Sequence, residues 1–165
     1  SYMYIQNSAA AGANSNIYWN STSPNETVFT IGSDANINAN GNSVIAYCWH
    51  SVPGYSAFGS YEANNDSNGP FIFTGFRPAF VLTKRVTAAE DWSIVDTTRS
   101  VNNPAYQNLR PSETNGEGSG IGSNDIDILS NGFKLRNNTA RFNSTGTYIY
   151  ACFAENPLSY PVTAR

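Results

Sequence analysis

Few residues in this sequence could carry out acid, base or nucleophilic chemistry, and they are scattered along it. His50 is the sole histidine, and no G-x-S-x-G elbow presents a serine nucleophile, so we expect no Ser-His-Asp triad. A glycosidase needs two carboxylates at a fixed separation. Asp125 and Asp127 would share one face of a strand, although Asp alternating with Ile is also typical of an exposed strand. We therefore predict a protein that is not an enzyme.

Metal ligands are equally sparse. Calcium prefers several oxygen ligands from one loop, and the segment 62–68 is rich in such oxygens, from Glu62, Asn64, Asn65, Asp66 and Asn68. The spacing differs from that of a known calcium loop, and Asn-rich turns also form without metal. Two cysteines and one histidine far apart do not suit zinc. We predict no cofactor, with calcium at Glu62 and Asp66 as the alternative.

Aromatic residues beside Asn-rich turns are best suited to hold a ligand. Sugars offer an apolar face and a rim of hydroxyls, so their sites combine a flat ring with amide or carboxylate partners. The candidate ligand-binding residues are Tyr55, Tyr61, Asn64, Asn65, Asp66, Trp92 and Tyr106. The aromatic residues interpreted as core are Trp49, Phe71, Phe73, Phe80 and Phe153. Packing in the core is also an alternative for the aromatic members of the first group.

An internal repeat organises the chain. The segment SVIAYCWHSVP at 43–53 aligns with TYIYACFAENP at 147–157, which places Cys48 over Cys152 at an offset of 104 residues. The same offset extends the match to residues 2–53 and 106–157. Gly69–Arg99, between the copies, has no counterpart, so either the fold uses it once or an earlier copy exists outside the sequence. We expect one domain over residues 1–165, forming the C-terminal part of a longer protein.

Short segments of alternating polarity, separated by Asn- and Gly-rich turns, predict many short strands. They are expected near 2–6, 16–19, 27–32, 43–50, 56–62, 70–74, 79–86, 91–96, 106–109, 125–129, 132–136 and 147–154. Ser130-Asn131-Gly132 is the clearest tight hairpin. Helical periodicity is limited to a short turn near 87–91. The pattern predicts an all-β sandwich or jelly roll.

The composition excludes several classes of partner. Only 13% of the 165 residues are charged, against about 25% in an average protein. The net charge of −3 provides no basic patch for nucleic acid. No apolar run approaches the roughly 20 residues of a spanning helix, so we expect no membrane insertion.

The two cysteines occupy apolar, strand-like segments. Buried free thiols are common in such segments, so we predict that Cys48 and Cys152 are free thiols. A single disulfide between them is the alternative.

Four long strings of this sequence resemble a domain found near the C-termini of tail-fibre and other virion structural proteins of tailed phages. They are residues 52–85, DWSIVDTTR at 91–99, LSNGFKLR at 129–136 and TYIYACFAENP at 147–157. The resemblance implies a lectin-like jelly roll of the concanavalin type. It also implies a non-enzymatic virion component, oligomeric and exposed on the particle surface, that contacts other virion proteins. It assigns no binding residue.

Three functions follow as hypotheses. The first is a surface-exposed tail-fibre or adhesion module that contacts a host-surface glycan. The second is a purely structural module for capsid decoration or fibre assembly. The third, with least support, is a glycan hydrolase.

Overall fold

The computed structural model describes residues 3–12, 15–118 and 125–157. The chain forms two compact units, which we describe separately. The N-terminal unit consists of Ser1–Tyr4 and Ala11–Trp49, and the sandwich unit consists of Ile5–Ala10 and His50–Arg165. No helix among the described residues is long and apolar enough to cross a membrane.

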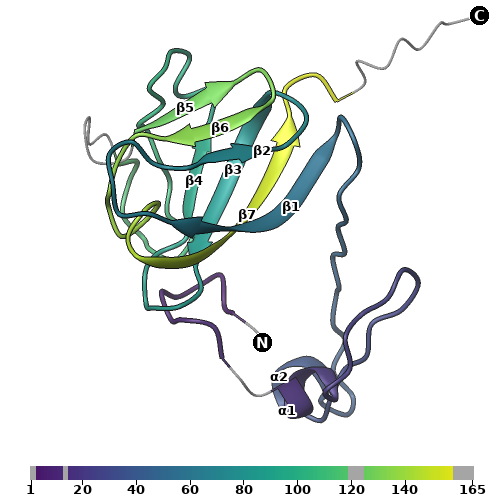
Figure 1. Cartoon of the computed structure of the whole chain (residues 1–165). Coiled ribbons are helices and arrows are strands. Elements are labelled where there is room, and N and C mark those ends of the chain that lie inside the picture. Colours follow the sequence, from purple (N-terminus) through teal and green to yellow (C-terminus); the bar gives the residue numbers. More distant parts are fainter. Residues whose placement is uncertain (1–2, 13–14, 119–124, 158–165) are drawn as a thin grey trace, which may run out of the picture. The chain divides into compact units, whose positions relative to one another are not determined.

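The sandwich unit contains two antiparallel sheets (Figure 1). The four-stranded sheet has the order β1-β7-β3-β4, with β1 at Ser56–Ala63, β7 at Gly146–Ala154, β3 at Pro78–Arg85 and β4 at Ser93–Asp96. The three-stranded sheet has the order β2-β6-β5, with β2 at Phe71–Phe73, β6 at Gly132–Leu135 and β5 at Ile126–Leu129. The predicted all-β fold of two sheets is confirmed.

The core lies between the two sheets, because alternate residues of each strand point inward. Tyr148 of β7 and Phe133 of β6 are fully buried. Tyr61 of β1 stacks on Tyr148 with ring centroids 5.2 Å apart, and its ring edge faces Phe133 from the opposite sheet. The Tyr61 hydroxyl donates to the Phe142 carbonyl at 2.7 Å, so this buried polar group is satisfied.

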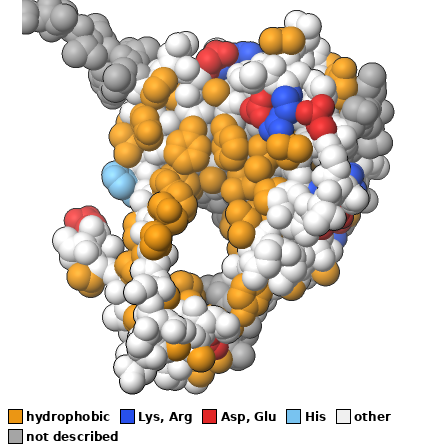
Figure 2. Space-filling model, turned by 180° about the vertical axis from the view of Figure 1, so that it is seen from behind, with side chains coloured by type: hydrophobic (Ala, Val, Ile, Leu, Met, Phe, Trp, Pro, Cys, Tyr) orange, Lys and Arg blue, Asp and Glu red, His pale blue; other side chains and the backbone are white. Residues whose placement is uncertain are grey.

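Part of the outer face of the four-stranded sheet is also apolar. Since residues paired across adjacent strands share a face, the registers place Phe58, Phe80 and Phe153 together on this side. The Phe153 ring meets the rings of Phe58 and Phe80 edge-on, at centroid separations of 5.8 and 5.9 Å. Hydrophobic side chains gather on this side of the sandwich unit (Figure 2). The part of the sheet around Phe153 is therefore apolar on both faces, whereas Glu62 and Lys84 lie farther along the outer face.

All seven observed strands match predicted ones, with bounds that differ by at most two residues. The predicted hairpin is also confirmed, because Leu129 pairs with Gly132 across a two-residue turn. A Cβ on Gly132 would lie 2.1 Å from the Ile72 carbonyl oxygen and 3.0 Å from the Phe71 ring. Only glycine allows β2 to approach β6 so closely.

Five predicted strands are absent. Residues 2–6 lie partly outside the described range, and the described residues 3–6, 27–32 and 43–50 have no strand partner. Residues 106–109 form only isolated bridges, such as that between Leu109 and Ile94. Residues 16–19 belong to helix α1 (Ser15–Trp19), and a second short helix, α2, follows at Ala35–Asn38. The carbonyls of Tyr18 and Ile17 accept from the Gly32 and Asp34 amides, which stabilises the end of α1.

Several burial predictions are wrong. Trp49, Phe71 and Phe73 are exposed, although the sequence suggested core positions. Phe80 and Phe153, also predicted as core, are partly buried on the outer face of the four-stranded sheet. Phe71 and Phe73 flank the inward-facing Ile72 and must therefore point outward. Both cysteines are free thiols, as predicted, but only Cys152 is buried while Cys48 is exposed. Burial raises the pKa of the Cys152 thiol.

Replacing a core ring should cost far more stability than replacing an exposed one. Phe133→Ala would leave a cavity beside Tyr61 and Tyr150, so we expect a loss of about 3 to 5 kcal/mol. Phe73→Ala, the exposed control, should change stability by less than about 0.5 kcal/mol. Denaturant unfolding of both variants measures the difference. Equal losses would contradict the assigned core.

Candidate functional site

A groove of about 530 Å³ opens at the end of the sandwich unit where β1 begins. One wall is the segment that leads into β1, and the other is the turn that follows β2. The groove is lined by Ser51, Pro53, Gly54, Ser56, Ala57, Phe73, Thr74 and Gly75. None of these lining residues carries a charge, so the groove suits a neutral ligand.

Hydrogen bonds hold both walls. Val52 and Ser56 exchange two backbone hydrogen bonds of 2.9 Å, and the Ser56 hydroxyl donates to the His50 carbonyl at 2.9 Å. On the other wall, the amides of Thr74 and Gly75 both donate to the Asn131 carbonyl of the β5–β6 hairpin. The groove is therefore preformed by ordinary turn chemistry.

Phe73 is the most prominent aromatic side chain of the groove, with 65% of the residue exposed. The register places Phe73 beside Gly132, and Phe71 beside Lys134, on the outer face of the small sheet. The Lys134 ammonium is occupied, because it donates to the Gly69 carbonyl at 2.7 Å. An exposed ring beside hydroxyls and backbone carbonyls is the combination that sugar recognition requires. Phe73 was not predicted as a ligand-binding residue, since all three residues of β2 are apolar and alternation alone does not reveal which of them points inward.

The structure separates the predicted ligand-binding residues. Tyr55 adjoins the groove, between Gly54 and Ser56, and is exposed, with its ring edge-on to Phe153. Asn64, Asn65 and Asp66 follow the other end of β1, and eight residues of strand span about 26 Å. These two groups therefore cannot contact one small ligand together.

Two of the predicted ligand-binding residues are buried, which does not suit a ligand site. Tyr61 is buried on the inner face of β1, where its ring packs in the core. Trp92, directly before β4, is buried as well. Tyr106 is partly buried, next to the bridge between Ala105 and Ile126. Core packing, the alternative interpretation, holds for Tyr61 and Trp92.

A buried amide positions the loop after β1. The Asn143 side chain is fully buried, and its Nδ2 lies 2.8 Å from Asn64 Oδ1, 2.7 Å from the Asp66 carbonyl and 2.8 Å from the Asn137 carbonyl. Its Oδ1 accepts from the Asn64 amide at 3.0 Å. Asn143 was missed because it lies about 80 residues from this loop in a turn-like sequence.

The calcium candidates already have partners. Glu62 Oε1 accepts from the Thr147 hydroxyl at 2.7 Å, and Asp66 Oδ1 accepts from the Asn68 amide at 2.7 Å. Over the described ranges, no group of three or more His, Cys, Asp or Glu side chains is placed to hold a metal ion. Calcium at Glu62 and Asp66 stays a prediction.

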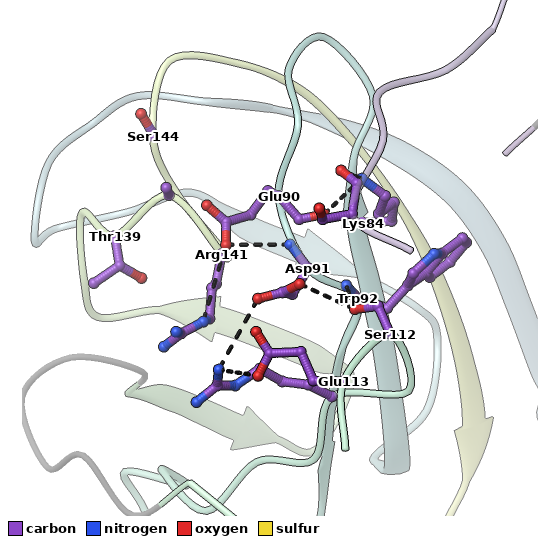
Figure 3. A network of polar contacts seen from close by, with 12 residues as sticks. Lys84, Glu90, Asp91, Trp92, Ser112, Glu113, Thr139, Arg141 and Ser144 are labelled. Atoms are coloured by element: carbon purple, nitrogen blue, oxygen red, sulfur yellow. Dashed lines mark hydrogen bonds and ion pairs between the residues drawn. The ribbon is translucent and has the colours of Figure 1, made fainter. Parts of the chain in front are cut away.

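Acidic and basic side chains meet in a separate cluster between the segments 90–92 and 110–113. Glu90, Asp91 and Glu113 converge there with Arg141 (Figure 3). The Ser112 hydroxyl donates to Asp91 Oδ1 at 3.1 Å. Arg110 Nη1 lies 2.5 Å from Glu113 Oε2 and 4.0 Å from Asp91 Oδ2. We refer to these residues as the acid–arginine cluster.

The Asp91 and Glu113 side chains influence each other's pKa. Burial, and then the Glu113 side chain, raise the pKa of Asp91 above its ordinary value. The hydrogen bond from Asn115, and then the Asp91 side chain, lower the pKa of Glu113. Glycosidase carboxylates stand about 5 to 9.5 Å apart to admit a sugar bond and water, whereas the Arg110 guanidinium lies within 4.0 Å of both Asp91 and Glu113. The acid–arginine cluster therefore links the loop at 90–92 to the loop at 110–113.

Comparison with protein families gives one match. The model described as a domain of unknown function (DUF7483) matches residues 1–157. The chain belongs to the DUF7483 family. No curated protein and no solved structure matches it. The DUF7483 match covers both copies of the internal repeat as well as the groove, Phe73 and the acid–arginine cluster.

The raised pKa of Asp91 in this DUF7483 chain predicts a pH effect on stability. Because the pKa of Asp91 is raised above its ordinary 3.8, the proton on Asp91 stabilises the folded state at low pH, and this stabilisation is lost as pH rises through the folded pKa. Asp91→Asn keeps a neutral side chain that can still accept from the Ser112 hydroxyl. We expect the variant to gain stability relative to the parent as pH rises from about 4 to 7.

Denaturant unfolding across this pH range measures the effect. Asp66→Asn, which changes an exposed loop carboxylate, is the control, and its profile should run parallel to that of the parent. A parallel profile for Asp91→Asn as well would show that the pKa of Asp91 is not raised in the folded chain.

Proposed function

We propose that this DUF7483 chain is a non-enzymatic binding module that holds a neutral glycan in the groove beside Phe73. The observation that carries the proposal is the exposed Phe73 ring at the mouth of a groove without charged lining residues. A sugar ring would stack on Phe73, since its apolar face matches the face of an aromatic ring. The glycan is the ligand class best suited to this combination.

The polar groups of the groove support the same ligand class. Hydroxyls of Ser51, Ser56 and Thr74 line it, and each already has a backbone partner, such as the Phe76 carbonyl for Thr74 Oγ1 at 2.7 Å. A hydroxyl oxygen has two lone pairs and one proton, so each can accept a further hydrogen bond from a sugar hydroxyl. Groups fixed in this way lose little side-chain entropy on binding.

The resemblance of the sequence to domains of phage tail fibres and other virion proteins supports a place on the virion surface. There, a glycan groove would contribute to contact with the host surface. Weak individual sites suit this setting, because several copies on one particle raise the overall avidity.

A structural module is the second candidate, and the outer face of the four-stranded sheet favours it. Phe58, Phe80 and Phe153 lie on this face together with Leu82 and Ile149, and all five are only partly buried. Contiguous apolar surface on a folded protein often marks a protein–protein interface. On this hypothesis the face packs against another virion chain and the groove stays empty.

Substituting the exposed ring separates the two functions. We expect Phe73→Ala to reduce binding to neutral glycans on an array by at least about fivefold, as the lost stacking contact is worth about 1 kcal/mol or more. Val101→Ala, at another highly exposed apolar residue, is the control and should bind like the parent. The array measures both variants at one protein concentration.

Two outcomes would contradict glycan binding in the groove. One is an absence of binding by the parent chain to any glycan, neutral or acidic. The other is equal binding by the parent and the Phe73→Ala variant, which would place the ligand elsewhere.

A further inference from the structure

An apolar segment of the N-terminal unit has no strand partner. Residues 43–49 are extended without regular structure, and every residue of the segment is exposed. Ile45 is 80% and Trp49 is 65% exposed. Val44 and Tyr47 are exposed as well, so large apolar side chains occupy both alternating faces. Sequences that are apolar on both faces are typical of strands covered on both sides.

The internal repeat identifies which strand this segment corresponds to. Its counterpart, 104 residues later, is β7. Strand β7 is paired with β1 from Gly146 to Phe153 on one side and with β3 from Tyr148 to Ala154 on the other. Cys48 corresponds to Cys152, which is buried in the core. The segment 43–49 therefore has the sequence of a central strand and neither of its neighbours.

A second pair of residues gives the same result independently. Phe29 and Ile31 correspond to Phe133 and Leu135 of β6 at the same offset. Phe133 and Leu135 are fully buried in the sandwich unit, whereas Phe29 and Ile31 are exposed in the N-terminal unit. The positions that form the core in one copy thus lack a core in the other.

The order of the strands shows what is missing. In the sandwich unit, residues 54–105 supply β1, β2, β3 and β4, and residues 106–157 supply β5, β6 and β7. The first group contains both neighbours of β7 and the partner of β6 on one side. Residues 2–53 repeat only the second group.

We infer that the N-terminal unit, Ser1–Tyr4 and Ala11–Trp49, belongs to the second half of another sandwich, and that its partner is a half-sandwich with the pattern of residues 54–105. In that sandwich the segment 43–49 inserts between a β1-like and a β3-like strand, and Phe29 and Ile31 enter the core. Binding of this kind is β-strand insertion, in which backbone hydrogen bonds give affinity and alternate side chains give register.

A fusion protein tests this inference. Residues 54–105 are placed a second time, in front of Tyr2 of the full chain, so that the junction of Ala105 with Tyr2 reproduces that of Ala105 with Tyr106. The added residues contain no cysteine, so the reactivity of Cys48 measures the exposure of the segment 43–49. We expect its reaction with an aryl disulfide reagent to slow by at least about 100-fold compared with the chain without the addition, since a buried thiol reacts only on local opening.

The matched control is the same fusion with Val81→Asp in the added copy only. Val81 is fully buried and pairs with Cys152, so a carboxylate there should block insertion and leave Cys48 reactive. Cys152 must remain unreactive in both fusions, which shows that the sandwich unit stays folded. Hydrogen exchange of the amides in 43–49 should report the same protection without the use of a thiol.

Two results would overturn the inference. The first is equal reactivity of Cys48 in the fusion and in the chain without the addition, together with rapid amide exchange in both. The second is protection of Cys48 already in the chain without the addition, with sedimentation as a dimer, which would show that a second copy covers the segment. Neither result depends on glycan binding at Phe73.

Discussion

The sandwich unit depends on hydrogen bonding along both edges of β7. This strand pairs with β1 through eight residues, from Gly146 to Phe153, and with β3 from Tyr148 to Ala154. Since residues of one strand alternate between faces, the same strand sends Tyr148 and Cys152 into the core and Phe153 to the outer aromatic face. Pairing, core packing and the outer face therefore all depend on one nine-residue segment.

The end of β7 also positions the groove. The Ala154 amide donates to the Tyr55 carbonyl at 2.8 Å, and the Glu155 amide donates to the Arg77 carbonyl at 2.9 Å. The first bond holds the wall before β1, and the second holds the chain just after the turn that follows β2. An ion pair of 2.9 Å between Arg77 Nε and Glu155 Oε2 adds to the second attachment. The strand that organises the core thus also sets the width of the groove in which Phe73 is exposed.

The sequence was sufficient to predict the strands of the sandwich unit, because alternation and turn residues are local signals. It was insufficient where the outcome depended on a partner. In β2, three apolar residues left the inward direction open, so Phe73 was assigned to the core. The segment 43–50 has a strand sequence but lacks a neighbour, and a strand cannot form alone. The contact of Asp91 with Glu113, and that of Asn143 with the Asn64 loop, join distant residues that no local pattern connects.

The two predicted residues that proved to be buried show a further limit. The alternation of polar and apolar residues in β1 is compatible with Tyr61 on either face of the strand. Only the contact with Phe133 of the opposite sheet shows that Tyr61 points inward. An aromatic residue near an Asn-rich turn is thus compatible with both a ligand site and a core. Tyr55 differs from Tyr61 because it lies in the turn before β1, where no opposite sheet covers it, and it is exposed.

The surroundings of Asn143 have a consequence for chemical ageing. Asparagine loses its amide when the following backbone nitrogen attacks the side-chain carbonyl carbon, and this makes it one of the thermolabile residues. Here the attacking nitrogen, that of Ser144, donates to the Tyr148 hydroxyl at 3.2 Å, and the Asn143 amide is held by its own hydrogen bonds. The attack would require these bonds to break together. In a chain rich in exposed asparagine, the residue that anchors the Asn64 loop is thereby protected from deamidation.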